Sequence, residues 1–245
     1  MVAARRSASD ALLITCEHGG NRVPAAYRGQ FAGLQDALKT HRGYDLGALL
    51  MARELAAAYK APLVASTVTR LLVDLNRSVG HANLHAKPVR ALPRDKREHI
   101  LAEHYQPYRA QVEGLVERAT ARGRRVVHLS SHSFTPELDG QVRTADIGLL
   151  YDPTRAGEVQ LCARWKAALA QVAPALRVRR NYPYEGKNDG FTSRLRRSHA
   201  PAAYVGVEIE INQAIVLGPP RRWADTRAAL IASLRMALAL PTARP

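Results

Sequence analysis

The stretch LLITCEHGGNRVP, residues 12–24, contains the pattern on which the fold prediction rests. Three apolar residues open it, and a cluster of polar groups with two adjacent glycines follows. A short apolar run bounded by a Gly-Gly turn predicts a buried strand. The run is too short for a membrane span, which needs roughly 18 apolar residues. In α/β folds, ligands bind just beyond the carboxyl ends of the strands. We therefore expect His18 to project into a crevice, although a lone histidine at this place is also consistent with a simple strand cap.

Two later segments repeat this pattern. VVHLSSHS, residues 126–133, reads as a second apolar strand that ends in histidine. YVGVEIEINQ, residues 204–213, reads as a third strand, with two acids at alternate positions. Three apolar strands that carry histidine or glutamate predict one shared site, and this set of residues indicates a metal-dependent amide hydrolase.

Strands and helices alternate along the whole length of 245 residues. The periodicity predicts helices at 46–59, 94–122, 155–172, 191–197 and 223–240, and strands at 12–14, 62–65, 69–73, 125–129, 146–151, 176–178 and 203–211. A kink or boundary is expected at Pro107. This order favours an α/β fold with a mostly parallel or mixed sheet and helices on both faces. We expect a single domain over residues 1–245, with residues 1–10 as a loose tail.

The chain is strongly basic, with 36 Lys and Arg against 21 Asp and Glu and a formal net charge of +15. Nucleic-acid binding is nevertheless disfavoured, because the charges are spread along the chain and aromatic residues are only 6%. The positive field suits a small anionic substrate. No run predicts a membrane span or signal peptide, so we expect a cytoplasmic protein without a membrane partner. The oligomeric state has no signal in the sequence.

A catalytic zinc site takes three nitrogen or oxygen ligands from the protein and leaves a position open. His18 and His132 are the first candidates, and Asp45 is the preferred third ligand, with Glu17 as the alternative. Asp45 equally suits the N-cap of the helix expected at 46–59. Asn21 is a poor zinc ligand, so we expect it to orient His18 or to bind substrate. A histidine and carboxylate site accepts several divalent ions.

Glu208 and Glu210 are two residues apart on one strand and therefore point to the same face. Burying two acids is costly without a cation or a metal to compensate them. A glutamate near the metal would serve as the general base and proton donor of an amide hydrolase. The alternative is an edge strand whose acids are solvated, because apolar residues line only its other face.

The tetrapeptide DLNR, residues 74–77, places an acid, an amide and a guanidinium at a strand end. An arginine fork matches a carboxylate, and a neighbouring amide can bind a carbonyl oxygen; a turn closed by an Asp-Arg pair is the alternative. A serine hydrolase is disfavoured, because no GxSxG elbow accompanies the serines beside His132. His81 and His85 are taken as surface residues.

Several segments together resemble the N-formylglutamate amidohydrolases over about residues 12–213. They are EHGGNRVP (17–24), TRLLVDLNRS (69–78), HSFTPELDG (132–140), GFTSRLRR (190–197) and VEIEINQ (207–213). The resemblance implies a three-layer α/β/α, zinc-exopeptidase-like (phosphorylase/hydrolase-like) fold, and hydrolysis of an N-acyl amino acid. The DLNR segment also looks like its counterpart in aspartoacylase and the zinc carboxypeptidases.

The resemblance also implies roles for individual residues. His18 and His132, with Asp45, would hold one zinc ion, and Glu210, with Glu208 beside it, would be the catalytic glutamate. The remaining positions would bind the substrate, with Asn76 and Arg77 at the scissile amide, Arg70 and Arg194 on substrate carboxylates, and Asn21 and Ser133 nearby.

Two departures bear on the substrate. The chain opens with EHGGN where the histidine-degradation enzymes are closer to PHSG, and the glycine pattern of residues 182–190 differs. The substrate is therefore expected to be a small anionic N-acyl amino acid, N-formyl or other, or a peptide-like amide. A basic, non-catalytic binding protein for an anionic metabolite or nucleic acid is the alternative.

Overall fold

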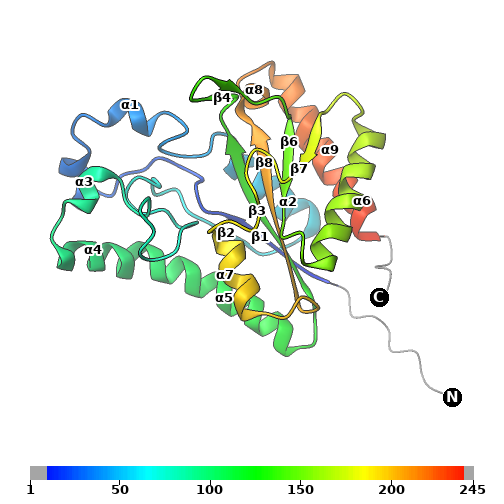
Figure 1. Ribbon diagram of the computed structural model, residues 1–245, viewed down its shortest axis with the longest axis horizontal. Coiled ribbons are helices and arrows are strands. Elements are labelled where there is room, and N and C mark those ends of the chain that lie inside the picture. The colour runs from blue at the N-terminus through cyan, green and yellow to red at the C-terminus, as the bar shows by residue number, and fades with distance from the viewer. Residues whose placement is uncertain (1–9, 240–245) are drawn as a thin grey trace.

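A six-stranded sheet forms the centre of the computed structural model, which describes residues 10–239 (Figure 1). Its spatial order is β2 (Leu63–Ala65), β1 (Ala11–Cys16), β3 (Val126–Phe134), β8 (Tyr204–Asn212), β6 (Ile147–Leu150) and β7 (Val178–Arg180). All neighbours pair in parallel except β6 and β8, which are antiparallel. The mixed sheet predicted from the sequence is confirmed.

Helices cover both faces of this sheet (Figure 1). One face packs against α2 (Ala48–Tyr59), α6 (Ala156–Val172) and α9 (Pro220–Ala239), through a cluster that includes Ile14, Leu129 and Trp165. The other face packs against α5 (Gln106–Ala121) and α7 (Phe191–Ser198), through a cluster that includes Leu13 and Val126. One layer of helices on each side of the sheet makes the expected three-layer α/β/α fold.

The helix expected over 94–122 is present as three consecutive helical segments. They are α4 (Arg94–Ile100), the π-helix η2 (Leu101–Tyr105) and α5. The π turn ends just before Pro107, whose ring cannot continue a regular helical hydrogen-bond ladder. The predicted irregularity therefore takes the form of a widened turn.

Shorter elements lie in the connections. They are η1 (Ala25–Phe31), α1 (Gln35–Leu38), α3 (Lys87–Arg90), the hairpin of β4 (Glu137–Leu138) and β5 (Gln141–Val142), and α8 (Gln213–Val216). In the described range 10–239, no helix is long and apolar enough to cross a membrane.

Two local expectations were wrong, and two alternatives left open by the sequence are excluded. Residues 69–73 form turns rather than a strand, and Leu72 and Val73 bury their side chains without pairing to the sheet. His85 is buried, with Nδ1 2.6 Å from the carbonyl oxygen of Leu72, rather than on the surface. Asp45 does not cap α2, which begins after Gly47 (φ 82°).

The second excluded alternative concerns β8, which lies inside the sheet with all nine residues buried, so its two acids are not solvated. Of the tail expected over 1–10, residues 1–9 lie outside the described range. Asp10 is held by Arg125, whose Nη2 lies 2.6 Å from its carboxylate.

Candidate active site

The candidate active site lies where β1, β3 and β8 end, on the face covered by α5 and α7. His18 follows β1 by two residues, and His132 lies near the end of β3. In the parallel register of β3 and β8, Ser130 pairs with Glu208 and His132 with Glu210. Neighbouring strands therefore present a histidine and two acids on one face, as the alternation of side chains requires.

Two histidines and an aspartate meet at one point. Nδ1 of His18 and Nδ1 of His132 lie 3.3 Å and 2.8 Å from the same carboxylate oxygen of Asp45. The three side chains are buried, and their candidate ligand atoms all lie within 4.8 Å of one another. Two imidazole nitrogens and a carboxylate form a donor set suited to a divalent metal ion.

The other nitrogen of each imidazole faces a second carboxylate. Nε2 of His18 lies 2.7 Å from Asp74, and Nε2 of His132 lies 3.2 Å from Glu17 and 2.8 Å from the hydroxyl of Ser130. A proton held at Nε2 by these acceptors leaves the Nδ1 lone pair directed at the cluster. This is the usual outer arrangement around a metal-binding histidine.

The local electrostatics favour a positive charge at the cluster. Burial works against an ionised Asp45, but His18 and His132 lower its pKa below the usual range. Burial likewise opposes a charged His132, yet its bonds to Asp45 and Glu17 raise its pKa. A proton or a metal ion at Nδ1 would both satisfy this environment.

Glu210 stands apart from the other acids. Its side chain is buried, and its Oε2 has no hydrogen-bond partner among residues 10–239. Burial raises its pKa to about 8, and Asp45 and Glu208 add to the shift against the opposing effect of His132. Glu208, by contrast, accepts a hydrogen bond from the hydroxyl of Thr192 at 2.5 Å. An unpartnered buried carboxyl beside a cluster of metal-type donors indicates a group prepared to interact with a ligand.

Both the cluster and the two glutamates line a cavity of about 190 Å³. The family model of N-formylglutamate amidohydrolase matches residues 10–217 of the chain. The chain belongs to the N-formylglutamate amidohydrolase family. It is accordingly an amidohydrolase-type hydrolase.

Solved structures agree with the family in fold. A gene product of Agrobacterium tumefaciens is 29% identical with a TM-score of 0.81, over 94% of this chain and 91% of that chain. N-formylglutamate amidohydrolase from Ralstonia eutropha is 20% identical with a TM-score of 0.69, over 94% of each chain. A comparison with curated proteins gives no match.

Most of the residues singled out in the sequence come together in this amidohydrolase. The cavity lining includes His18, Asp45, Arg70, Asn76, Arg77, His132, Ser133, Glu208 and Glu210. The guanidinium of Arg70 binds the acids around the cluster, since it donates to Asp45 at 3.2 Å and to Asp74 at 2.7 Å. Arg70 also lines the cavity, and its contact with a substrate carboxylate stays a prediction.

Three candidates occupy other places. Glu17 lies on the far side of the His132 ring, where Tyr108 and Ser130 donate to it, and it is not one of the three grouped donors. Arg194 is half exposed on α7 and faces Glu113 at 3.7 Å, and Asn21 donates to the carbonyl oxygen of Leu38. Neither Arg194 nor Asn21 lines the cavity.

The sequence reasoning missed several lining residues. His41 comes from the loop before α2, and burial together with Arg42 and Arg70 lowers its pKa. Tyr184, Asn188 and Asp189 come from the loop before α7. The sequence of that loop stands out only in its glycine pattern, and the segment around His41 has no periodicity that would single it out.

Proposed function

We propose that the protein is a zinc-dependent hydrolase that cleaves the amide bond of a small N-acyl amino acid, with Glu210 as general base. One observation supports this above the others. Three buried metal-type donors and a buried carboxyl with an unpartnered oxygen face the same small cavity.

The donor set fits a single divalent ion. His18, His132 and Asp45 would hold it through two nitrogens and one oxygen, which leaves a coordination position open for catalysis. When bound, such an ion supplies a Lewis acid that polarises an amide carbonyl and lowers the pKa of water. Asp74 and Glu17 would fix the two imidazole rings from behind.

Glu210 would move the protons. As a carboxylate it takes a proton from the attacking water, and as a carboxylic acid it gives one to the departing amine. Its burial suits both roles, because a raised pKa brings it nearer to the working pH. Glu208, held by Thr192, would keep a second negative charge beside it.

The substrate would be small, as a cavity of about 190 Å³ requires. Arg77 is half-buried in the lining and donates from Nη1 to the carbonyl oxygen of Asp189 at 2.6 Å, which fixes the guanidinium against the wall. Its remaining donors suit a substrate carboxylate. Asn76 and Ser133 line the same space and would contact the amide region.

The test is the metal content of the purified protein, measured before and after chelation, with hydrolysis of N-formyl and N-acetyl amino acids assayed in parallel. About one zinc per chain, with activity lost on chelation and restored by zinc, is expected. Glu210→Gln should keep the metal but lose most turnover, whereas Glu117→Gln, an exposed acid on α5, should behave as wild type. A protein that neither binds nor responds to metal, and binds RNA with a steep salt dependence, would instead support a basic binding protein.

A further inference from the structure

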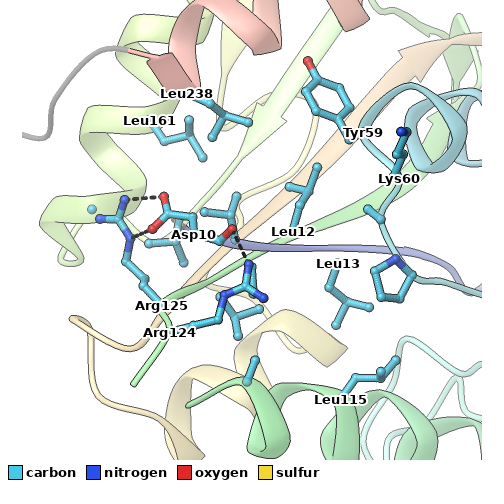
Figure 2. A pocket seen from close by; sticks show the side chains of 18 of the residues that line it. Asp10, Leu12, Leu13, Tyr59, Lys60, Leu115, Arg124, Arg125, Leu161 and Leu238 are labelled. Carbon is cyan, nitrogen blue, oxygen red and sulfur yellow. Dashed lines mark hydrogen bonds and ion pairs between the residues drawn. The ribbon is translucent and has the colours of Figure 1, made fainter. Parts of the chain in front are cut away.

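A second and larger cavity, of about 770 Å³, opens at the other end of the sheet (Figure 2). It lies at the amino ends of β1, β3 and β8, where Ala11, Val126 and Val205 contribute to its lining. The candidate active site lies at the carboxyl ends of the same strands. The two cavities are therefore separated by the length of the strands.

The floor of this cavity is apolar because both hydrophobic layers of the fold reach it. Leu12, Leu161 and Leu238 come from the layer of α2, α6 and α9. Leu13 and Leu115 come from the layer of α5 and α7. Figure 2 shows these two groups of leucines on opposite sides of β1. A cavity of this size with such a floor is large enough for an extended apolar molecule.

The rim is basic. Six cationic residues contribute to the lining: Lys60, Arg118, Arg122, Arg124, Arg125 and Arg164. Asp10 is the one acid among the lining residues that the structure describes, and Arg125 already binds it at 2.6 Å. Within residues 10–239, Lys60, Arg118, Arg122 and Arg164 form no ion pair. In the described part of the chain, positive charge is thus concentrated around an apolar floor with a single acid beside it.

Arg164 lies close to the other cations of the rim. Its Nε donates to the carbonyl oxygen of Ala237 at 3.0 Å, so the guanidinium is held against α9 at the cavity wall. Burial lowers its pKa, and the charge of Arg125 lowers it further. An anion at the rim would relieve the repulsion between these cations.

We infer that this cavity binds a free acyl carboxylate, with its chain on the leucine floor and its carboxylate at the rim by Arg118 and Arg122, four residues apart at the end of α5. A small inorganic anion would use the rim but leave the floor in contact with water. A nucleic acid would meet the rim through its phosphates but would find little aromatic surface on which to stack its bases. An acyl carboxylate matches both parts, because it carries an apolar body and one anionic head.

The test is isothermal titration of the full-length protein with octanoate, alongside acetate and 1-octanol. Octanoate should bind at least tenfold more tightly than acetate, which lacks the chain, and than 1-octanol, which lacks the charge. Equal binding of octanoate and acetate would overturn the inference, and so would the absence of octanoate binding.

Two variants locate the site. Arg118→Glu with Arg122→Glu should weaken octanoate binding at least tenfold. The matched control is Lys166→Glu with Arg197→Glu, which makes the same change of net charge at exposed positions outside the lining and should change binding less than twofold. Ala119→Phe, which places a bulky ring in the cavity lining without changing charge, should also weaken binding.

Equal weakening by the two charge variants would mean that only the general field of the protein is at work, and would overturn the site. Binding of a short RNA that is lost in the rim variant, without any octanoate binding, would assign the rim to nucleic acid instead. Circular dichroism of each variant verifies that the fold is retained.

Discussion

Two histidines on β3 lie on the same face of the same strand, four residues apart, and both are buried, yet their surroundings are opposite. His128 lies between two hydroxyl groups, with Thr15 2.8 Å from Nε2 and Tyr204 2.6 Å from Nδ1. His132 lies between the carboxylates of Asp45 and Glu17. Burial lowers the pKa of His128 to about 4, whereas the two acids raise that of His132.

The difference shows what makes a buried histidine a site residue. A neutral imidazole between neutral hydroxyls has both nitrogens satisfied and nothing left to offer a ligand. An imidazole between acids attracts a cation, whether a proton or a metal ion. The strand contributes the position, and the neighbouring strands and loops decide the chemistry.

The largest expected effect separates the two histidines by metal content. His132→Ala should lose the metal and reduce turnover by about a thousandfold, because several kcal/mol of transition-state stabilisation go with the ion. His128→Ala should keep about one metal ion per folded chain but lower the free energy of unfolding by about 3 kcal/mol, since two buried hydroxyls lose their partner. Elemental analysis and urea unfolding measure the two effects. Loss of metal in both variants would remove the distinction.

A smaller effect tests the acids behind the cluster. Glu17→Gln should weaken metal affinity by about 10- to 100-fold, because a neutral amide holds the His132 ring less firmly. Competition with a chelator gives the affinity. Asp146→Asn is the control, since this buried acid pairs with Arg177 and Arg222 and is not among the partners of either histidine. Equal losses in both variants would show that reduced stability, rather than the orientation of His132, is the cause.

Much of the fold could be predicted from the sequence. The strands that carry His18, His132 and Glu210 were predictable, because apolar runs and period-two alternation are local signals. The segment 69–73 was mistaken for a strand for the same reason. Its apolar side chains fill the layer beneath α5, while its backbone bonds to loops, as from Thr69 to Arg22 at 3.0 Å.

The site was predictable in part. Histidines and acids at strand ends were visible, but nothing local distinguishes His128 from His132. The groups that decide between them include Thr15, Glu17 and Asp45, which meet β3 only in the folded chain. Uncharged outer partners such as Tyr108 are ordinary core residues by sequence, so only the tertiary structure reveals them.

The low pKa of His128 should make the stability of the fold depend on pH. Folded His128 stays neutral down to about pH 4, whereas an unfolded histidine takes up a proton below about pH 6.5. The unfolded state therefore binds the extra proton in this window, and stability falls as the pH is lowered from about 6.5 to 4. The loss amounts to about 2 kcal/mol at pH 5. Urea unfolding of metal-free wild type and His128→Gln at pH 7 and pH 5 should show a smaller loss in the variant, and equal losses would contradict it.

The smallest effect extends the comparison from histidines to arginines. Arg77 and Arg194 both matched a substrate-binding pattern in the sequence, but Arg77 lines the cavity and Arg194 is half exposed against Glu113. Arg194→Ala should therefore change kcat/KM by less than twofold, because an exposed pair at 3.7 Å contributes little. Arg77→Ala in the same assay should raise KM clearly, since it removes a cation from the cavity wall. A tenfold loss of kcat/KM in Arg194→Ala would mean that this side chain reaches the substrate during turnover. That result would contradict the distinction between the two arginines.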